Sequence, residues 1–106
     1  MDLREIAARM EAFVREKGWY AEGSAKPQTP RNLATSVVIE AAELLECFQW
    51  QDPPDTVCVA NELADVILYA TQIANVMKID LEGAVADKLQ LNQRRVWPKT
   101  PAGDSR

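Results

Sequence analysis

The chain has 106 residues, 47% of them hydrophobic, and its 12 basic and 16 acidic side chains give a net charge of −4. A chain of this length forms one domain, and its negative charge argues against a surface that binds long nucleic acid. The sequence has no histidine. This absence removes histidine-based catalysis, nearly all zinc sites and the Glu-x-x-His pattern of di-iron bundles.

The two cysteines and the N-terminal residues indicate the cellular compartment in which the protein is expected. Cys47 and Cys58 stand in apolar helical surroundings without the spacing of a metal-binding pair, so we expect two small, buried, reduced side chains. The first residues, MDLREIAARM, are too charged for a signal peptide, and we expect no apolar run of membrane-spanning length. The sequence therefore predicts a soluble, cytoplasmic protein that does not bind membranes.

A first helix is predicted at the N-terminus. Asp2 followed by Glu5 resembles a capping box, and Gly18 is a plausible helix stop. Between them, apolar residues recur on one helix face: Leu3, Ile6, Met10 and Phe13. The segment 19–29 has no periodicity and contains glycine, serine and proline, which predicts a loop.

Two longer helices are predicted in the middle of the chain. Thr29 as N-cap and Pro30 at the first helical position begin one helix, which we expect to reach about Gln51. Residues 52–55, DPPD, end it, and the same prolines can begin the next helix. That third helix has a broad apolar face formed by Val59, Leu63, Val66, Ile67, Ala70, Ile73, Ala74 and Met77.

A fourth helix is predicted after Asp80, its candidate cap, and before Pro98. Its expected buried stripe is Leu81, Val85 and Leu89. No segment alternates with period two, so the fold class is predicted to be all-α, an antiparallel four-helix bundle. We expect residues 1–97 to form the single domain and 98–106 a disordered tail.

Acidic side chains are set into the two apolar helices at a repeated spacing. Glu40 and Glu43 lie within the apolar run 37–50, and Glu62 and Asp65 within the run 57–77. Residues three apart share a helix face, so each pair presents two carboxylates side by side. Charges in apolar surroundings are costly unless they are paired or coordinate a metal.

If the two helices are antiparallel neighbours, the four carboxylates converge. Carboxylates that close repel one another or take up protons, and a hard cation such as Mg²⁺, or alternatively Mn²⁺, resolves the conflict. Because Mg²⁺ commonly binds few carboxylates together with substrate phosphates, a nucleotide is a natural ligand. The alternative is an ordinary solvated acidic face, for which Glu46 is an example.

The sequence motifs that contain and flank these acidic pairs resemble those of a known family. The motif ExxE, 18 residues, then ExxD is similar to the pattern of the all-α nucleotide pyrophosphohydrolases, the MazG-like superfamily. PRNL (30–33), ELLECFQW (43–50), NELADVILY (61–69) and the late K-x-x-x-N-x-x-R are similar to its dCTP pyrophosphatase branch. The resemblance extends from about Pro30 to Pro98. The sequence departs from many members at Ile39, where they carry another glutamate, and in the loop before Pro30.

The resemblance implies a Mg²⁺-dependent enzyme that converts a (deoxy)nucleoside triphosphate to the monophosphate and pyrophosphate. The four carboxylates would hold the metal, and Glu40 or Glu43 would also orient or deprotonate the attacking water. The implied substrate is dCTP or a modified cytosine nucleotide, and the implied role is cleaning of the nucleotide pool. Family members assemble as dimers or tetramers, so a homo-oligomer, such as a homotetramer, is expected.

Candidate phosphate-binding residues lie on the fourth helix. Lys88, Asn92 and Arg95 share one face and could hold a triphosphate, the role that the resemblance implies. The alternative is that these residues only complement a helix C-terminus. Arg31, at the start of the second helix, is a weaker candidate.

Trp50 and Trp19 are candidates for stacking on a nucleobase. Alternatively, both side chains pack in the core or at an interface. For Trp97, packing is the favoured interpretation. In similar enzymes neighbouring subunits complete the base pocket, so Trp50 could belong both to the site and to an interface.

Two other functions remain open. A non-catalytic helical oligomerisation or regulatory module would use the carboxylates in salt bridges between chains. It would need basic partners, yet the segment Leu33–Met77 contains no lysine or arginine. A metal-dependent nuclease or phosphatase of another type is the third possibility.

Overall fold

A computed structural model of the chain describes residues 1–96 and 98. This part contains four helices and no strand: α1 (Leu3–Glu16), α2 (Pro30–Gln49), α3 (Thr56–Met77) and α4 (Leu81–Arg94). The all-α fold class is confirmed. The predicted tail lies almost wholly outside the described residues, as does Trp97, so the division at residue 97 stays a prediction.

Each helix begins after a residue whose side-chain oxygen accepts a hydrogen bond from a backbone N–H of the first turn. The four caps are Asp2, Thr29, Asp55 and Asp80. In α2 the Asn32 N–H donates to Thr29 Oγ1 at 3.2 Å, as the sequence predicts. The prolines do not begin α3, because Asp55 follows them and its carboxylate accepts from the Val57 N–H at 2.9 Å.

The helix ends differ slightly from the expected positions. α1 ends before Gly18, whose φ of 75° is the left-handed conformation expected of a glycine stop. α2 ends at Gln49, just before the expected Gln51, and α4 ends at Arg94, short of Pro98. Lys78 terminates α3 with a φ of 59°, and the Ile79 N–H then donates to the Ala74 carbonyl at 2.8 Å.

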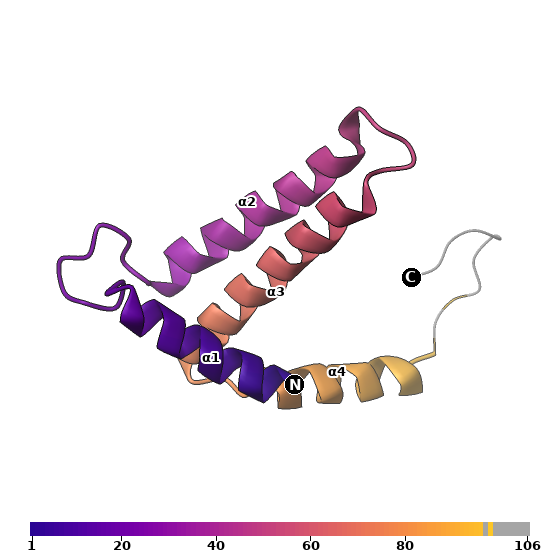
Figure 1. Cartoon of the computed structure of the whole chain (residues 1–106). Coiled ribbons are helices and arrows are strands. Elements are labelled where there is room, and N and C mark those ends of the chain that lie inside the picture. Colours follow the sequence, from indigo (N-terminus) through magenta and orange to yellow (C-terminus); the bar gives the residue numbers. More distant parts are fainter. Residues whose placement is uncertain (97, 99–106) are drawn as a thin grey trace.

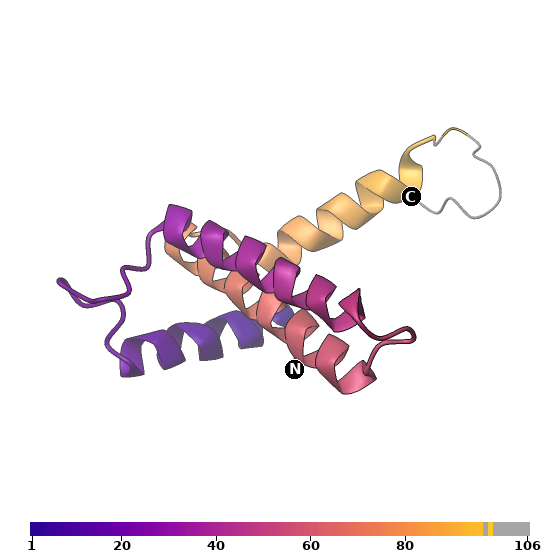
Figure 2. The same ribbon diagram turned by 90° about the horizontal axis from the view of Figure 1, so that it is seen from above.

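The helices are arranged around α3. α2 and α3 lie side by side and antiparallel, and α1 packs across α3 near its C-terminal end (Figure 1). α4 starts beside the N-terminus of α1 and then diverges from the α2–α3 pair, which is clear in both views (Figures 1 and 2). The α2–α3 pair is therefore the frame on which the acidic residues are held.

Polar contacts fix α1 to its two neighbours. The Asn75 side chain on α3 donates to the Ala7 carbonyl at 2.8 Å. The Arg4 guanidinium donates to Asp80 Oδ2 at 2.9 Å and to Glu82 Oε2 at 2.6 Å. These bonds connect the start of α4 to the first turn of α1.

The apolar core of the single chain is small. Its fully buried apolar residues are Val14, Leu33, Cys47 and Ala74. The predicted buried stripe of α4 is wrong for the chain alone, because Val85 is 49% and Leu89 57% exposed while Leu81 is half-buried. The reason is the direction of α4, which starts beside α1 and then diverges from the α2–α3 pair (Figure 2).

The cysteines also differ from the expectation. Cys47 on α2 and Cys58 on α3 form a disulfide, with Cα atoms 6.0 Å apart, so the prediction of two reduced side chains is wrong. The antiparallel turn between the helices places these residues at the same level, although they are 11 positions apart in sequence.

The apolar character of α3 exceeds what we expected from the sequence. With 22 residues it is, by length and composition alone, the one helix of the described chain that could span a membrane. The prediction that no run reaches this length is therefore wrong. In this fold the same helix packs between α1 and α2 and carries Glu62 and Asp65, and the central helix of a helical domain meets the same criteria.

Candidate metal centre

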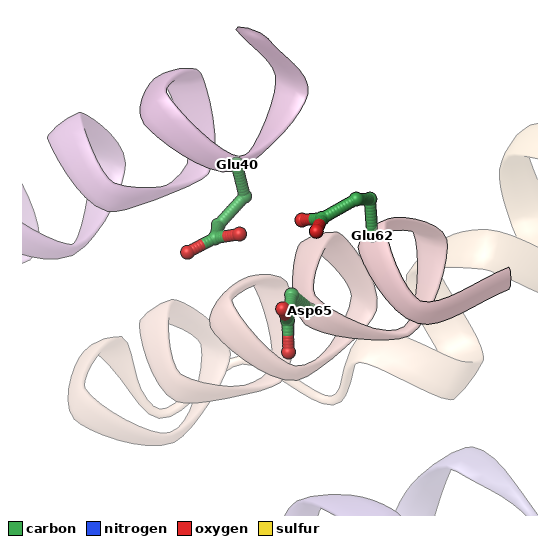
Figure 3. Close-up of side chains that lie close together, drawn as sticks. All are labelled: Glu40, Glu62 and Asp65. Atoms are coloured by element: carbon green, nitrogen blue, oxygen red, sulfur yellow. The ribbon is translucent and has the colours of Figure 1, made fainter. Parts of the chain in front are cut away.

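Three carboxylates from the two paired helices meet in one place. Glu40 extends from α2 toward α3, where Glu62 and Asp65 lie one turn apart on the same face (Figure 3). One oxygen from each carboxylate lies within 4.8 Å of the others, and all three side chains are half-buried. The convergence follows from the antiparallel pairing together with the three-residue spacing.

Two oxygens of this cluster lack partners. Glu40 Oε2 and Glu62 Oε2 are both buried without a hydrogen bond. An unpartnered buried oxygen of a carboxylate is energetically costly, and such an atom requires an explanation. The segment Leu33–Met77, which contains the cluster, has no lysine or arginine to neutralise the two oxygens.

The pKa of Glu40 reflects the same crowding. It is raised from 4.5 to about 7, first by burial and then by the adjoining carboxylate of Glu43, with contributions from Asp65 and Glu62. Without a counter-charge, the cluster therefore tends to hold a proton at Glu40.

The donor set fits a hard divalent cation. It consists of carboxylate oxygens alone, close enough to share one ion, and it contains the two unpartnered atoms that an ion would satisfy. Mg²⁺ and Mn²⁺ prefer such oxygen ligands. Glu40, Glu62 and Asp65 are the residues that would hold the ion.

Glu43 is adjacent to this triad but is not one of its three members. It is half-buried one turn after Glu40, and its carboxylate contributes to the raised pKa of Glu40. The structure thus brings three of the four predicted ligands together, with the fourth beside them. Glu46 is exposed, in agreement with a solvated position.

The predicted phosphate-binding residues lie elsewhere in the single chain. Lys88, Asn92 and Arg95 are on α4 and at its C-cap, and α4 diverges from the acidic pair of helices (Figure 2). Arg31 is exposed in the first turn of α2. The chain by itself therefore does not bring the α4 residues to the carboxylates.

The two candidate tryptophans differ in their surroundings. Trp50, at the C-cap of α2, is 88% exposed. Trp19 is half-buried. Its ring is edge-on to the ring of Phe13, with the two centroids 5.7 Å apart, and Lys26 Nζ lies 5.0 Å from the centroid of the Trp19 ring. Trp19 lines a cavity of about 410 Å³ between the loop after α1 and the facing parts of α2 and α3.

This cavity contains residues that the sequence did not single out. Tyr69 and Gln72 line it from α3, four and seven residues after Asp65 and on the same side of the helix. A polar glutamine in the apolar half of α3 was the available signal. That signal is weak, because a single glutamine within a helix has no spacing that marks a binding site.

Comparison with known proteins identifies the family. The model of the MazG-like family matches residues 35–100. The chain belongs to the MazG-like family. The resemblance inferred from the ExxE and ExxD motifs is thereby confirmed.

The relatives of this MazG-like chain include named enzymes. It is 32% identical to human dCTP pyrophosphatase 1 in an alignment of 104 residues. The match covers 89% of the chain and 56% of the human protein. It is 43% identical to a dATP/dGTP diphosphohydrolase of Salmonella phage PMBT28 over 44 residues, 42% of the chain and 15% of the phage protein. The chain thus spans little more than half the length of the dCTP pyrophosphatases that it matches.

A solved structure is similar over nearly the whole MazG-like chain. The crystal structure of a pyrophosphatase from Archaeoglobus fulgidus is 34% identical in sequence and superposes with a TM-score of 0.71. The match covers 91% of this chain and 92% of the archaeal one.

Proposed function

We propose that this MazG-like protein is a nucleotide pyrophosphohydrolase that uses Mg²⁺, or Mn²⁺ in its place, to convert a (deoxy)nucleoside triphosphate to the monophosphate and pyrophosphate. The observation that carries the proposal is the convergence of Glu40, Glu62 and Asp65 with two buried, unpartnered oxygens. The names of the human, phage and archaeal relatives support the same reaction class.

The acidic residues have separate roles in this proposal. Glu40, Glu62 and Asp65 hold the cation. When bound, the cation polarises the phosphate oxygens and lowers the pKa of the attacking water. Glu43 lies next to this cluster without being one of its three members, so it is our choice for the base that orients the water and accepts its proton.

The phosphate-binding role of α4 requires a second copy of the chain. Large apolar side chains are exposed on α2, α3 and α4, including Val38 at 69%, Leu45 at 70% and Leu89 at 57%. This number of exposed large apolar side chains supports an interface between copies of the chain. In a homodimer or homotetramer, α4 of one copy could lie along the α2–α3 pair of another and bring Lys88, Asn92 and Arg95 to the triphosphate. Trp50 would then be covered as well.

The substrate we propose is dCTP or a modified cytosine nucleotide, and the role is removal of unwanted nucleotides from the cytoplasmic pool. The similarity to dCTP pyrophosphatase 1 supports a cytosine base. The shorter match to a dATP/dGTP diphosphohydrolase makes purine nucleotides the alternative.

The test is to incubate the purified protein with each dNTP and Mg²⁺ and to identify the products. We expect deoxynucleoside monophosphate and pyrophosphate. Release of orthophosphate would point to another kind of hydrolase. No turnover with any nucleotide or divalent ion would favour a non-catalytic helical module.

A further inference from the structure

The cavity beside Trp19 adjoins the carboxylate cluster. Ser36 lies four residues before Glu40 on α2, and Tyr69 four residues after Asp65 on α3. Four residues of helix span about 6 Å, so the cavity begins roughly one turn along the helix pair from the cluster. A nucleotide with its phosphates at the carboxylates can therefore extend its base into the cavity.

The lining of the cavity suits a heteroaromatic ring. It combines the aromatic side chains of Trp19 and Tyr69 with the apolar side chain of Leu33, and its one charged residue is Lys26. Its volume of about 410 Å³ is in the range of small-molecule sites. Aromatic faces with a few polar groups are the usual environment of a bound base.

Most amide and hydroxyl donors around the cavity are already used by nearby backbone carbonyls. Asn32 Nδ2 donates to the Pro27 carbonyl at 3.0 Å, and Gln28 Nε2 to the Lys26 carbonyl at 2.7 Å. The two hydroxyls on α2 likewise donate to carbonyls of the preceding turn: Thr35 to Arg31 at 2.9 Å, and Ser36 to Asn32 at 3.2 Å.

Gln72 differs from these four residues. It lines the cavity, is 1% exposed, and neither Nε2 nor Oε1 of its amide has a hydrogen-bond partner. A leucine or methionine would fill a similar volume without burying an unsatisfied donor and acceptor. The unused pair of groups matches the adjacent donor and acceptor that a nucleobase presents on its edge, and a glutamine amide can pair with such an edge through two hydrogen bonds.

We propose that Gln72 is a specificity-determining residue, whose amide hydrogen-bonds the donor–acceptor edge of the nucleobase seated in this cavity. The inference rests on the proposed function, because the base reaches the cavity only when the phosphates lie at the carboxylate cluster. A site built to hydrogen-bond a substrate group rejects an analogue that lacks the group, since the buried amide is then left unpaired.

The test combines one substitution with one change in the base. The value of kcat/KM is measured for the best dNTP and for the same triphosphate without the exocyclic group of its base, with the unaltered protein and with Gln72→Leu. For the unaltered protein we expect removal of the exocyclic group to lower kcat/KM by roughly 10- to 100-fold, the discrimination of a two-bond amide–base pair. For Gln72→Leu we expect a decrease of less than about threefold, because the discriminating contact is already absent.

A matched control lies next to Gln72. Thr71 is also fully buried, but its hydroxyl donates to the Leu68 carbonyl at 2.6 Å and it does not line the cavity. Thr71→Val should keep the full discrimination of the unaltered protein. If Gln72→Leu does not fold, Gln72→Met serves as the second apolar variant.

Each other result overturns a specific statement. Equal discrimination by Gln72→Leu and the unaltered protein would refute the role of Gln72 while leaving the pyrophosphohydrolase activity intact. The same holds if both enzymes ignore the missing group. No cleavage of any dNTP by the unaltered protein would refute the proposed function itself, and this inference with it.

Discussion

The carboxylate of Glu40 on α2 faces that of Glu62 on α3, and each has one buried oxygen without a hydrogen-bond partner (Figure 3). Asp65 completes the group, and the segment Leu33–Met77 around it contains no lysine or arginine. The pairing of the helices thus forces anionic groups together, and a bound cation would relieve the repulsion. The following predictions test this relationship and the structure around it.

Glu43→Gln should separate metal binding from turnover. Because the triad remains, we expect the variant to fold and to bind Mn²⁺, while kcat falls by roughly 100-fold or more from loss of the general base. Glu62→Gln removes a member of the triad, so it should weaken Mn²⁺ binding in addition to lowering kcat. Manganese titration and product formation are measured on the same preparations. Glu46→Gln, an exposed change on the same helix, should alter neither, and full activity in Glu43→Gln would refute its assigned role.

The metal-free protein should lose stability as the pH rises from 4.5 to about 7. In this window folded Glu40 retains its proton, whereas in the unfolded chain the same group has released it, so rising pH favours unfolding. Urea unfolding in the presence of a chelator, at several pH values, measures this dependence. Glu40→Gln should flatten the slope over the same window. If the free energy of unfolding of Glu40→Gln depends on pH as strongly as that of the unaltered protein, Glu40 does not hold the proton.

Divalent metal should reverse this pH trend. Because the cation competes with the proton at Glu40, its affinity should increase as the pH rises through about 7. We expect thermal stabilisation by Mg²⁺ to be larger above this pH than below it. Stabilisation that is independent of pH, or that persists in Glu40→Gln, would place the cation elsewhere.

The sequence predicted the helices well because their ends are determined locally. Asp2, Thr29 and Asp80 were recognisable caps, and each makes the expected hydrogen bond. The acidic triad was predictable for a similar reason. Residues three apart share one helix face, and pairing of the two helices is enough to bring their carboxylates together.

Contacts between distant segments were not predictable in this way. The start of α4 lies beside α1, where Arg4 contacts Asp80 and Glu82, residues more than 70 positions away, and no pattern within α4 specifies this placement. The Cys47–Cys58 bond depends on the level at which two helices pair. The unsatisfied amide of Gln72 becomes apparent only when every neighbour is known.

Asn75 should matter to stability more than an exposed asparagine on the same helix. Asn75→Ala removes the bond to the Ala7 carbonyl, and loss of this contact between α1 and α3 should lower the free energy of unfolding by about 0.5–1.5 kcal/mol. Asn61→Ala, on the exposed side of α3, should change it by less than about 0.5 kcal/mol. Chemical denaturation of both variants gives the comparison. Equal effects would contradict the packing of α1 described above.

The exposed face of α4 should hold copies of the chain together. Leu89→Glu places a charge within the stripe of Val85 and Leu89, so we expect it to shift sedimentation toward the monomer and to reduce turnover. Gln90→Glu adds the same charge at the neighbouring exposed position and is the control. An unaltered protein that sediments as a monomer, yet turns over dNTPs at full rate, would refute the proposed role of a second copy.

The most direct test of the acidic cluster is anomalous diffraction from crystals grown with Mn²⁺. We expect a peak bounded by the carboxylates of Glu40, Glu62 and Asp65, within coordination distance of oxygens from both α2 and α3. A manganese ion found only at other residues, with these three side chains still facing one another without it, would contradict the claim that the cluster is a metal site.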